Sequence, residues 1–407
     1  SQFRSNNAGA RTRLARPTNL HPTRGPDGLP RYAWHFDAPD TDGDGLDDDV
    51  EWVVGTHASE GDSDRDGITD RLEIAQGTNP IDGLPAATGL IARLSIPGRA
   101  VDIDASQGLV AAAAESAGVV LVDVANPFNP IRIAQVETPG PARAVVFGAQ
   151  TLVVACGSAG LVIVDVSQPS VAGVLHQVLL GSPVTAVATN GTIAFAGLSN
   201  GKLVEVDTLS GSVLRQVQVG SAAVQDVAVG REVLYILTAG TLHTADLTDG
   251  EIGAIVSVAS PGSVGAGGRR LRLSLDQDRL YATHTQGVNV FSLADPAAPA
   301  LLRSNATAQF GWKHLVPNGS GLGLAAVAAN STDDGAHDVT LYTLGADGSL
   351  SALTTVPTPG LAAAVAIHNG LGFVADGEGG IAVINYLAYD AQGIPPTISL
   401  SASFQLA

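Results

Sequence analysis

Short apolar segments, separated by Gly, Asn and Ser, recur through most of the chain. From residue 119 onward one strand type returns seven times, as VVLVDV, LVIVDV, LVEVDT, LHTADL, VNVFSL, VTLYTL and IAVINY. Each copy has a short polar residue near its end, at intervals of 42, 42, 39, 46, 51 and 42 residues: Asp123, Asp165, Asp207, Asp246, Ser292, Thr343 and Asn385. We expect these side chains to hydrogen-bond the backbone of the following turn, which is a structural role.

Further apolar runs lie between these copies, among them ARAVVFG, TLVVACG and TIAFAGL. Four short strands in each repeat of about 42 residues are typical of a β-propeller blade. Leucine-rich solenoids have shorter periods, and helical repeats would need a helical periodicity that is absent here. The sequence therefore predicts an all-β fold, a seven-bladed β-propeller over residues 88–392, preceded by a small N-terminal connector.

We call the seven recurring strands signature strands. The first two and the last lie in the segments AGVVLVDVANPFNP, GSAGLVIVDVSQPS and ADGEGGIAVINYLAYD. These stretches resemble the bacterial LVIVD-repeat family of β-propellers. The middle copies, such as THTQGVNVFSLADPAAP, keep the pattern but not the letters. The resemblance covers roughly residues 89–390 and implies a fold, whereas it implies no particular chemistry.

Residues 88–98, TGLIARLSIPG, have the form of the strand that follows each signature strand, yet they precede the first blade. We expect this segment to pair into the last blade and close the ring. A competing closure would use TISLSASF near the C-terminus, but Pro395 and Pro396 interpose and IPPTISL resembles the opening strand of bacterial immunoglobulin-like modules. Residues 393–407 are thus either a C-terminal strand or the start of a following module.

Charge divides the chain into three regions. Residues 1–36 hold six Arg and one Asp (+5), residues 37–82 hold fifteen acidic residues and two Arg (−13), and the rest carries −10, for a net charge of −18. Such an acidic chain lacks the phosphate-neutralising surface that nucleic-acid binding needs. With 45% hydrophobic and 15% charged residues, it is too apolar for general disorder.

The basic, Pro/Asn-rich leader, residues 1–36, is predicted by composition to be a disordered arm. Its Arg residues could lie on acidic surface of this chain or of a neighbouring module.

The chain starts at Ser1 and has no Met, so we interpret it as a processed product or an excised fragment. The single Cys156 excludes an internal disulfide, and no apolar stretch approaches the ~18 residues that span a bilayer.

The acidic region contains two motifs of the form D-x-D-x-D-G-x-x-D-x-x-E, namely DTDGDGLDDDVE and DSDRDGITDRLE. In such a loop positions 1, 3 and 5 surround one point with carboxylates, Gly at 6 permits a sharp turn, position 7 offers its carbonyl, position 9 binds directly or through water, and Glu at 12 reaches back with both oxygens. The first predicted calcium-ligand set is Asp40, Asp42, Asp44, the carbonyl of Leu46, Asp48 and Glu51. The second is Asp62, Asp64, Asp66, the carbonyl of Ile68, Asp70 and Glu73, and Gly45 and Gly67 occupy the turns.

Helices do not flank both sides of these loops, because Pro39 precedes the first and only the exits VEWVVG and RLEIAQG can form short helical turns. The 22-residue repeat and the ending GTNP resemble thrombospondin type 3-like calcium repeats of bacterial surface proteins, over residues 37–82. That resemblance implies a stiff connector filled with two or more Ca²⁺ ions and an extracellular or cell-surface location in a bacterium. Extracellular calcium modules typically bind at ~10⁻⁴ to 10⁻³ M.

A weaker constellation lies where each innermost strand is expected to begin, at one mouth of the central channel: Arg99, Arg143, Thr185, Gln225, Arg270 and Lys313, with Trp312 and His314 beside the last. Clustered cations there would attract an anionic ligand. The alternative is that each Arg pairs with a carboxylate of a neighbouring blade, for instance Asp102 or Asp226.

Two function classes follow. The favoured one is a non-enzymatic calcium-binding structural and interaction module of a large secreted or cell-surface bacterial protein, whose partners are a protein or glycan ligand and neighbouring domains of a larger chain. The alternative is a propeller enzyme of the lactonase or quinone-dependent dehydrogenase type, with its site at the channel mouth. Such an enzyme needs clustered carboxylates, a metal or a stacking Trp. Trp312 alone meets this need, and zinc-site and serine-hydrolase motifs are absent.

Overall fold

Two compact units make up the protein, one formed by Ser1–Ala86 with Pro395–Ala407 and the other by Ala87–Ile394. The computed structural model describes residues 20–24, 30–34, 39–64, 68–76, 80, 89–230, 232–247, 252–261, 272–276, 278–306, 311–328, 337–368 and 370–386. The first unit carries the acidic motifs, and the second is the propeller.

The first unit contains a hairpin and two short helices. Strands β1 (Leu20–Arg24) and β2 (Pro30–Trp34) pair antiparallel, from Leu20 opposite Trp34 to Arg24 opposite Pro30. Composition predicted a disordered arm here, and for these residues it was wrong, because an average over 36 residues does not register two short pairing segments. Helices α1 (Asp48–Val54) and α2 (Asp70–Gln76) begin at position 9 of each acidic motif. The expected helical turns at both exits are thereby confirmed.

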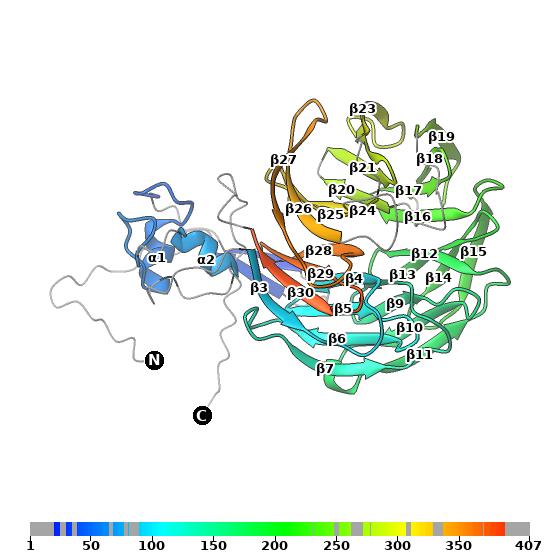
Figure 1. Cartoon of the computed structure of the whole chain (residues 1–407), viewed down its shortest axis with the longest axis horizontal. Helices are drawn as coiled ribbons and strands as arrows, with labels where there is room; N and C mark the ends of the chain where they lie inside the picture. Colours follow the sequence, from blue (N-terminus) through cyan, green and yellow to red (C-terminus); the bar gives the residue numbers. More distant parts are fainter. Residues whose placement is uncertain are drawn as a thin grey trace. The chain divides into compact units, whose positions relative to one another are not determined.

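Seven four-stranded antiparallel sheets form the second unit, as the seven signature strands predicted (Figure 1). The first four blades are β4–β7 (Asp102–Ser106, Leu109–Ala113, Val119–Asp123, Ile131–Val136), β8–β11 (Ala144–Phe147, Thr151–Ala155, Leu161–Asp165, Gly173–Val178), β12–β15 (Val184–Thr189, Ile193–Leu198, Lys202–Asp207, Val213–Gln218) and β16–β19 (Val224–Val229, Val233–Thr238, Thr241–Asp246, Ile255–Ala259). The next two are β20–β23 (Arg272–Asp276, Arg279–His284, Gly287–Ser292, Ala300–Ala306) and β24–β27 (Trp312–Pro317, Leu322–Ala328, His337–Leu344, Leu350–Val356). A short 3-10 helix, η1 (Pro169–Val171), precedes β11.

The seventh blade closes the ring with a strand from the N-terminal side. It consists of β28 (Ala364–His368), β29 (Leu371–Ala375), β30 (Ile381–Asn385) and, outermost, β3 (Gly89–Leu94). In Figure 1 β3 lies beside β30, and the register runs from Gly89 opposite Asn385 to Leu94 opposite Ile381. The expectation of N-terminal closure is confirmed, whereas residues 393–407 lie outside the described residues.

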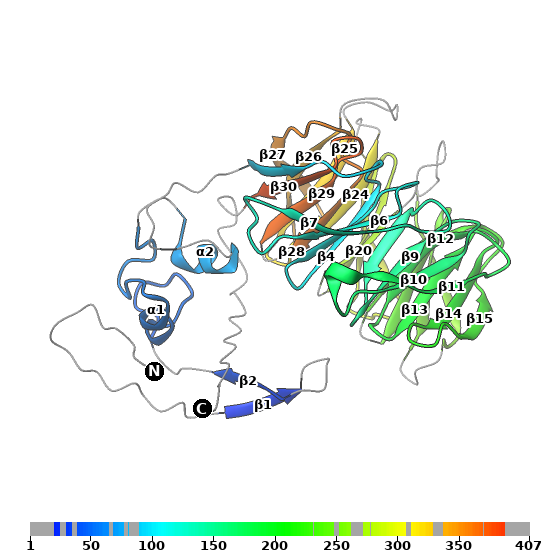
Figure 2. The same ribbon diagram turned by 90° about the horizontal axis from the view of Figure 1, so that it is seen from below.

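The second and third strands of each blade are buried on both faces, because each blade is stacked between two others (Figure 2). Every residue of β9 is buried, while β7 and β15 on the periphery consist mostly of exposed and partly buried positions. This explains why the signature strands read as continuous apolar runs. Four of the seven polar ends act as expected: Asp123, Asp165, Asp207 and Ser292 each accept a backbone N–H from two residues further along the chain.

Innermost strands of neighbouring blades contact one another all round the ring, and polar side chains join several of these interfaces. The Asp102 carboxylate accepts the Val145 N–H of blade two at 3.1 Å, and Asp226 accepts the Leu273 N–H of blade five at 2.7 Å. His314 Nδ1 likewise accepts the Val365 N–H of blade seven at 3.3 Å. Because these bonds join one blade to the next, carboxylates on the innermost strands have a structural task.

Asp104 makes a fourth such contact, accepting the Phe147 N–H at 2.8 Å. Burial raises the pKa of this half-buried carboxyl from 3.8 to about 6, against the lowering effect of its hydrogen bonds with the Phe147 and Ala105 amides, and the nearby Asp102 charge raises it further. Between pH 4 and 6 the unfolded chain therefore ionises this group while the folded chain keeps it protonated. Stability should fall as pH rises through that window, by about 2 kcal/mol after allowance for solvent.

Asp104→Asn should remove this pH dependence, because an amide stays neutral. Urea unfolding at pH 4.5 and pH 7 measures it: relative to the native chain, the Asn variant should gain stability at the higher pH. Asp165→Asn is the control, since hydrogen bonds with Ser167 lower the pKa of that exposed carboxyl. A stability difference for Asp104→Asn that is the same at both pH values would contradict this account.

Candidate calcium loops and channel mouth

The first acidic loop brings three carboxylates together. Oxygen atoms of Asp40, Asp42 and Asp44 all lie within 4.8 Å of one another. Asp40 accepts the N–H groups of Gly43 (2.8 Å) and Gly45 (3.1 Å), which folds the loop back over its own first residue. Gly45 takes φ +96°, the left-handed conformation that makes Gly the favoured residue at position 6. The loop thus has the shape and the donor set of a cation site.

The position-9 carboxylates hydrogen-bond the residue at position 2 of their own loops. Asp48 accepts the Thr41 N–H and Thr41 hydroxyl, both at 2.8 Å. Asp70 accepts the Ser63 N–H at 2.8 Å and the Ser63 hydroxyl at 2.6 Å. The sequence assigned both residues as ligands, directly or through water, and this assignment stays a prediction, to which the structure adds a tie to position 2. The signal was present in both motifs, because Thr or Ser stands directly after the first Asp.

The Glu at position 12 is the strongest indication that a cation belongs in the first loop. Glu51 is fully buried, and neither of its carboxylate oxygens has a hydrogen-bond partner. Burial, together with the charges of Asp42, Asp44 and Asp48, raises its pKa to about 7. A buried, unpartnered carboxylate is costly unless a metal or another charge compensates it. The residues present therefore fit Ca²⁺, which would be held by Glu51 and the Asp cluster.

The second loop has the same framework where the structure describes it. Glu73 is 3% exposed and Ile68 is buried like its counterpart Leu46. Burial is again the main cause that raises the pKa of Asp70, as it is for Asp44 in the first loop. Asp66 and Gly67 of the motif lie outside the described residues. The same position-2 tie and buried Glu support a second cation site.

The two loops pack against each other through contacts that the motif alone does not reveal. The Arg71 N–H donates to Asp44 Oδ2 at 3.1 Å. A Cβ on Gly61 would lie only 2.8 Å from the Asp44 Cβ, so this approach requires Gly. Sequence reasoning missed Arg71 and Gly61, because their contacts join one repeat to the next.

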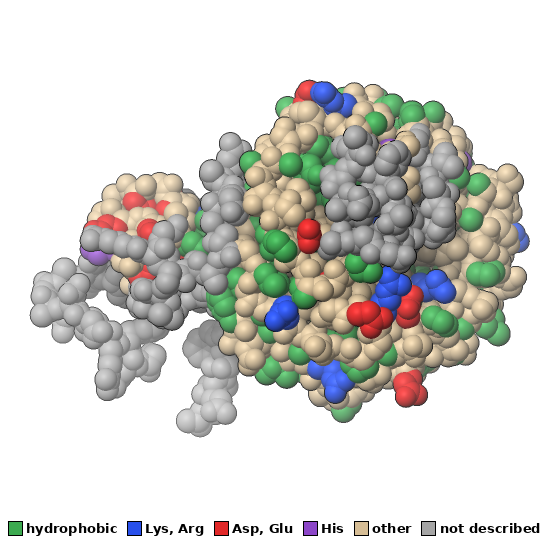
Figure 3. All heavy atoms as spheres, viewed as in Figure 1, with side chains coloured by type: hydrophobic (Ala, Val, Ile, Leu, Met, Phe, Trp, Pro, Cys, Tyr) green, Lys and Arg blue, Asp and Glu red, His purple; other side chains and the backbone are tan. Residues whose placement is uncertain are grey.

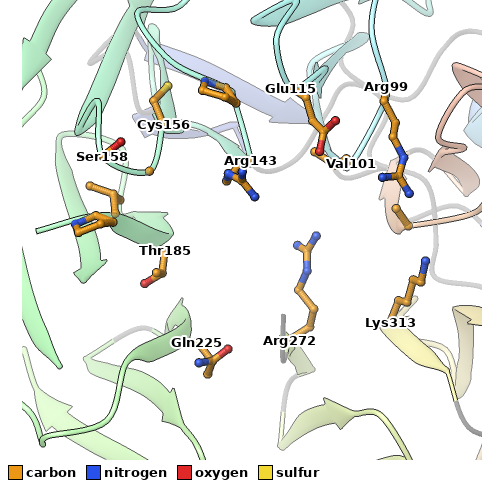
Figure 4. Close-up of a pocket in the computed structure, with 15 residues that line it drawn as sticks. Arg99, Val101, Glu115, Arg143, Cys156, Ser158, Thr185, Gln225, Arg272 and Lys313 are labelled. Carbon is orange, nitrogen blue, oxygen red and sulfur yellow. The ribbon is translucent and has the colours of Figure 1, made fainter. Parts of the chain in front are cut away.

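In the propeller, a cavity of about 680 Å³ lies where the innermost strands begin. All seven blades contribute to its wall, so it marks one mouth of the central channel (Figure 4). Of the residues expected there, the structure places Arg99, Arg143, Thr185, Gln225 and Lys313 on the wall. Also on the wall are Val101, Glu115, Pro141, Cys156, Gly157, Ser158, Pro183, Val184, Arg272 and Ala363.

β-Bulges aim three of these side chains at the cavity. The register shifts between Val184 and Ala186, between Val224 and Asp226, and between Trp312 and His314. The extra residues are Thr185, Gln225 and Lys313, each of which lines the cavity. A bulge commonly re-aims a side chain in this way.

Other residues expected at the mouth have different positions. Trp312 is buried between blades and its ring lies 5.0 Å from that of Tyr342, and His314 hydrogen-bonds within the blade interface, so neither lines the cavity. They flank the bulged Lys313 on the strand, and successive strand residues point to opposite sides. Arg270 lies outside the described residues. Arg272, which the sequence did not single out, lines the cavity instead.

Arg272 forms a buried ion pair with Asp102 at 2.6 Å. Their strands belong to blades five and one, which are not neighbours, so the pair crosses the channel. Arg272 is 7% exposed and Asp102 is 2% exposed. The sequence analysis gave pairing of an Arg with a carboxylate such as Asp102 as the alternative to an anion-binding role. Arg272 does pair with Asp102, but the two residues lie on opposite sides of the channel and not on neighbouring blades.

Comparison with family models assigns both parts of the chain. The model for the bacterial TSP3 repeat matches residues 40–56 and 62–83, and the model for the LVIVD repeat matches residues 97–138 and 150–178. The chain carries TSP3 and LVIVD repeats. The first TSP3 match begins at Asp40 and the second at Asp62, the first residues of the two acidic loops. A search of curated proteins gives no match.

Solved structures agree on the fold. The chain is similar to a structure of U3-55K (TM-score 0.59, 11% identity, covering 73% of this chain and 98% of that one). It is also similar to the Cps50 (Swd1) β-propeller domain of Myceliophteria thermophila (TM-score 0.57, 14% identity, 74% and 99% covered). The computationally designed Ika8 protein gives TM-score 0.53 at 13% identity, with 74% and 100% covered. At these identities the likeness shows the propeller fold alone. Among the described residues, no helix is long and apolar enough to cross a membrane.

Proposed function

We propose that the protein is a non-enzymatic calcium-binding module of a large secreted or cell-surface bacterial protein. In this proposal the TSP3 repeats form a calcium-stiffened connector, and the LVIVD propeller is a platform for a protein or glycan ligand. The observation that carries it is the fully buried Glu51 carboxylate, which has no hydrogen-bond partner and belongs to the loop of Asp40, Asp42 and Asp44. Calcium at millimolar levels outside cells suits loops of this kind.

The wall of the channel mouth supports binding rather than catalysis. Among its residues Glu115 is the one carboxylate, and no His lines the part of the cavity that the structure describes. Burial raises the pKa of the Cys156 thiol to about 11, so it stays protonated at neutral pH. The described residues of the wall thus support the proposal, because they do not combine a nucleophile, a base and an orienting group. Trp312, the platform that a quinone enzyme would use, packs on Tyr342 instead.

Two measurements test this function. Antibodies against the chain should label intact bacteria that produce the parent protein, without permeabilisation, and labelling only after permeabilisation would contradict the proposed location.

The purified chain should show no turnover above background with lactone or alcohol substrates, with and without added quinone cofactor. Turnover that disappears in Glu115→Gln would instead make the mouth an active site.

A further inference from the structure

We propose that the channel mouth binds a small multivalent oxyanion, one that carries two or three carboxylate or sulfate groups. This rests on the proposed function, because it names the site and the ligand class of the propeller platform. The site is the cavity described above, where the innermost strands begin.

The dimensions of the cavity suit a small ligand. Its volume of about 680 Å³ falls within the ~300–1,000 Å³ that is usual for ligand sites. Its wall combines residues of innermost strands, such as Gln225 and Arg272, with residues of the turns that adjoin the strands, such as Glu115 and Gly157. All seven blades contribute to it, so the closed ring itself forms the cavity.

Charge is what distinguishes this space from the rest of the protein. Among the described residues, four cationic side chains line it, Arg99, Arg143, Arg272 and Lys313, together with the carboxylate of Glu115. Asp102 compensates Arg272 through their ion pair. Counting Asp102, the described part of the site carries four positive and two negative charges, a net +2, within a chain of net charge −18. An anion entering the mouth therefore meets a local field opposite in sign to that of the protein as a whole.

The cations are spread around the ring rather than gathered on one element. Arg143 precedes β8, Arg272 begins β20 and Lys313 lies in β24, so they belong to blades two, five and six. Figure 4 shows Arg143 and Arg272 extending into the same space, with Arg99 and Lys313 together at one side of it. A ligand with a single anionic group would reach one of these positions, whereas a multivalent one can meet several at once. This spread is why the proposal specifies two or three groups.

The rest of the wall strengthens such contacts. Val101, Pro141, Pro183, Val184 and Ala363 are apolar, and they lower the local dielectric around the charged groups. The side-chain amide of Gln225, aimed inward by its bulge, adds a neutral donor. Figure 3 shows basic and acidic side chains beside one another near the middle of the propeller face in view, with mostly uncharged surface around them.

Isothermal titration calorimetry of the full chain tests the proposal, in calcium-replete buffer of low ionic strength. The probes are benzene-1,3,5-tricarboxylate, sodium sulfate and, as the uncharged comparison, 1,3,5-tris(hydroxymethyl)benzene. The tricarboxylate should bind one to one and sulfate more weakly, and the neutral probe should not bind. Raising the salt concentration should weaken tricarboxylate binding, because the contacts are charge-assisted.

Arg99→Gln and Lys313→Gln should each weaken tricarboxylate binding about tenfold. Arg132→Gln is the matched control, since Arg132 is exposed on the outer strand β7 and its loss changes the net charge equally. Arg272 is left intact because it is part of the buried pair. Circular dichroism and the melting temperature show that each variant is folded.

Three results would overturn the site: no tricarboxylate binding by the native chain, equal binding of the neutral probe, or equal weakening by Arg132→Gln. None of these would touch the proposed function, because surface labelling, absence of turnover and calcium binding are measured separately. Conversely, tight tricarboxylate binding by a chain found only inside cells would support the mouth site and contradict the proposed function.

Discussion

Chelation of calcium is expected to expose residues 39–76 to proteases while the propeller stays folded. Without cations, the carboxylates of each loop repel one another at close range and Glu51 is buried with nothing to compensate it. Each bound ion stabilises its loop by about 1.4 kcal/mol at the tenfold excess that millimolar calcium has over a Kd of ~10⁻⁴ M, so two ions contribute about 3 kcal/mol. The propeller has its own hydrophobic clusters between blades. Limited proteolysis followed by mass spectrometry, with calcium or EGTA, locates the cleavage sites.

Single substitutions separate the two loops. Glu51→Gln and Glu73→Gln should each lower the calcium affinity of one loop at least tenfold, because a neutral amide cannot supply a bidentate charged ligand. Glu137→Gln, an exposed Glu of the propeller, is the control and should leave calcium titrations unchanged. If calorimetry found no calcium binding at millimolar concentrations, or if the EGTA and calcium digests were the same, the calcium connector would be wrong.

Architecture was the part of this protein most open to prediction. Each blade repeats the same strand pattern, so the number of signature strands equals the number of blades. Residues 88–98, which precede the first blade, were left without a sheet of their own and were therefore expected to complete the last blade. The competing segment TISLSASF, near the C-terminus, is separated from the last signature strand by Pro395 and Pro396. A repeat thus lets the sequence specify the number and order of the blades as well as the strands within them.

Contacts between distant positions were the part that could not be predicted. The Arg272–Asp102 pair joins residues 170 positions apart, and no local pattern relates blade five to blade one. The prediction that Trp312 and His314 line the mouth was wrong for a similar reason. A bulge places Lys313 in the cavity wall, whereas its two neighbours pack in the blade interfaces. Bulges add one residue without changing the apolar pattern, so the sequence shows the strand but not which side chain turns inward.

Removal of β3 should destabilise the propeller more than removal of residues 1–86 alone. A shortened chain that begins at Ala87 keeps β3 and should melt like the native propeller, whereas one that begins at Gly98 lacks it. β3 pairs with β30 at five positions, and Ile91, Leu94 and Ile96 pack on the core cluster between blades one and seven. Roughly five ladder hydrogen bonds at ~1 kcal/mol each give a loss of about 5 kcal/mol, or about 10 °C in melting temperature.

Removal of β3 should also make the chain associate as its concentration rises. β30 would become an unpaired sheet edge with the apolar sequence IAVIN. Analytical ultracentrifugation of the chain that begins at Gly98 should therefore show association that the chain from Ala87 lacks. A synthetic peptide of residues 87–97 should restore both the monomer and part of the lost melting temperature, since it supplies the missing strand in trans. Equal melting temperatures for the two shortened chains, both monomeric, would mean that the ring does not depend on β3 for closure.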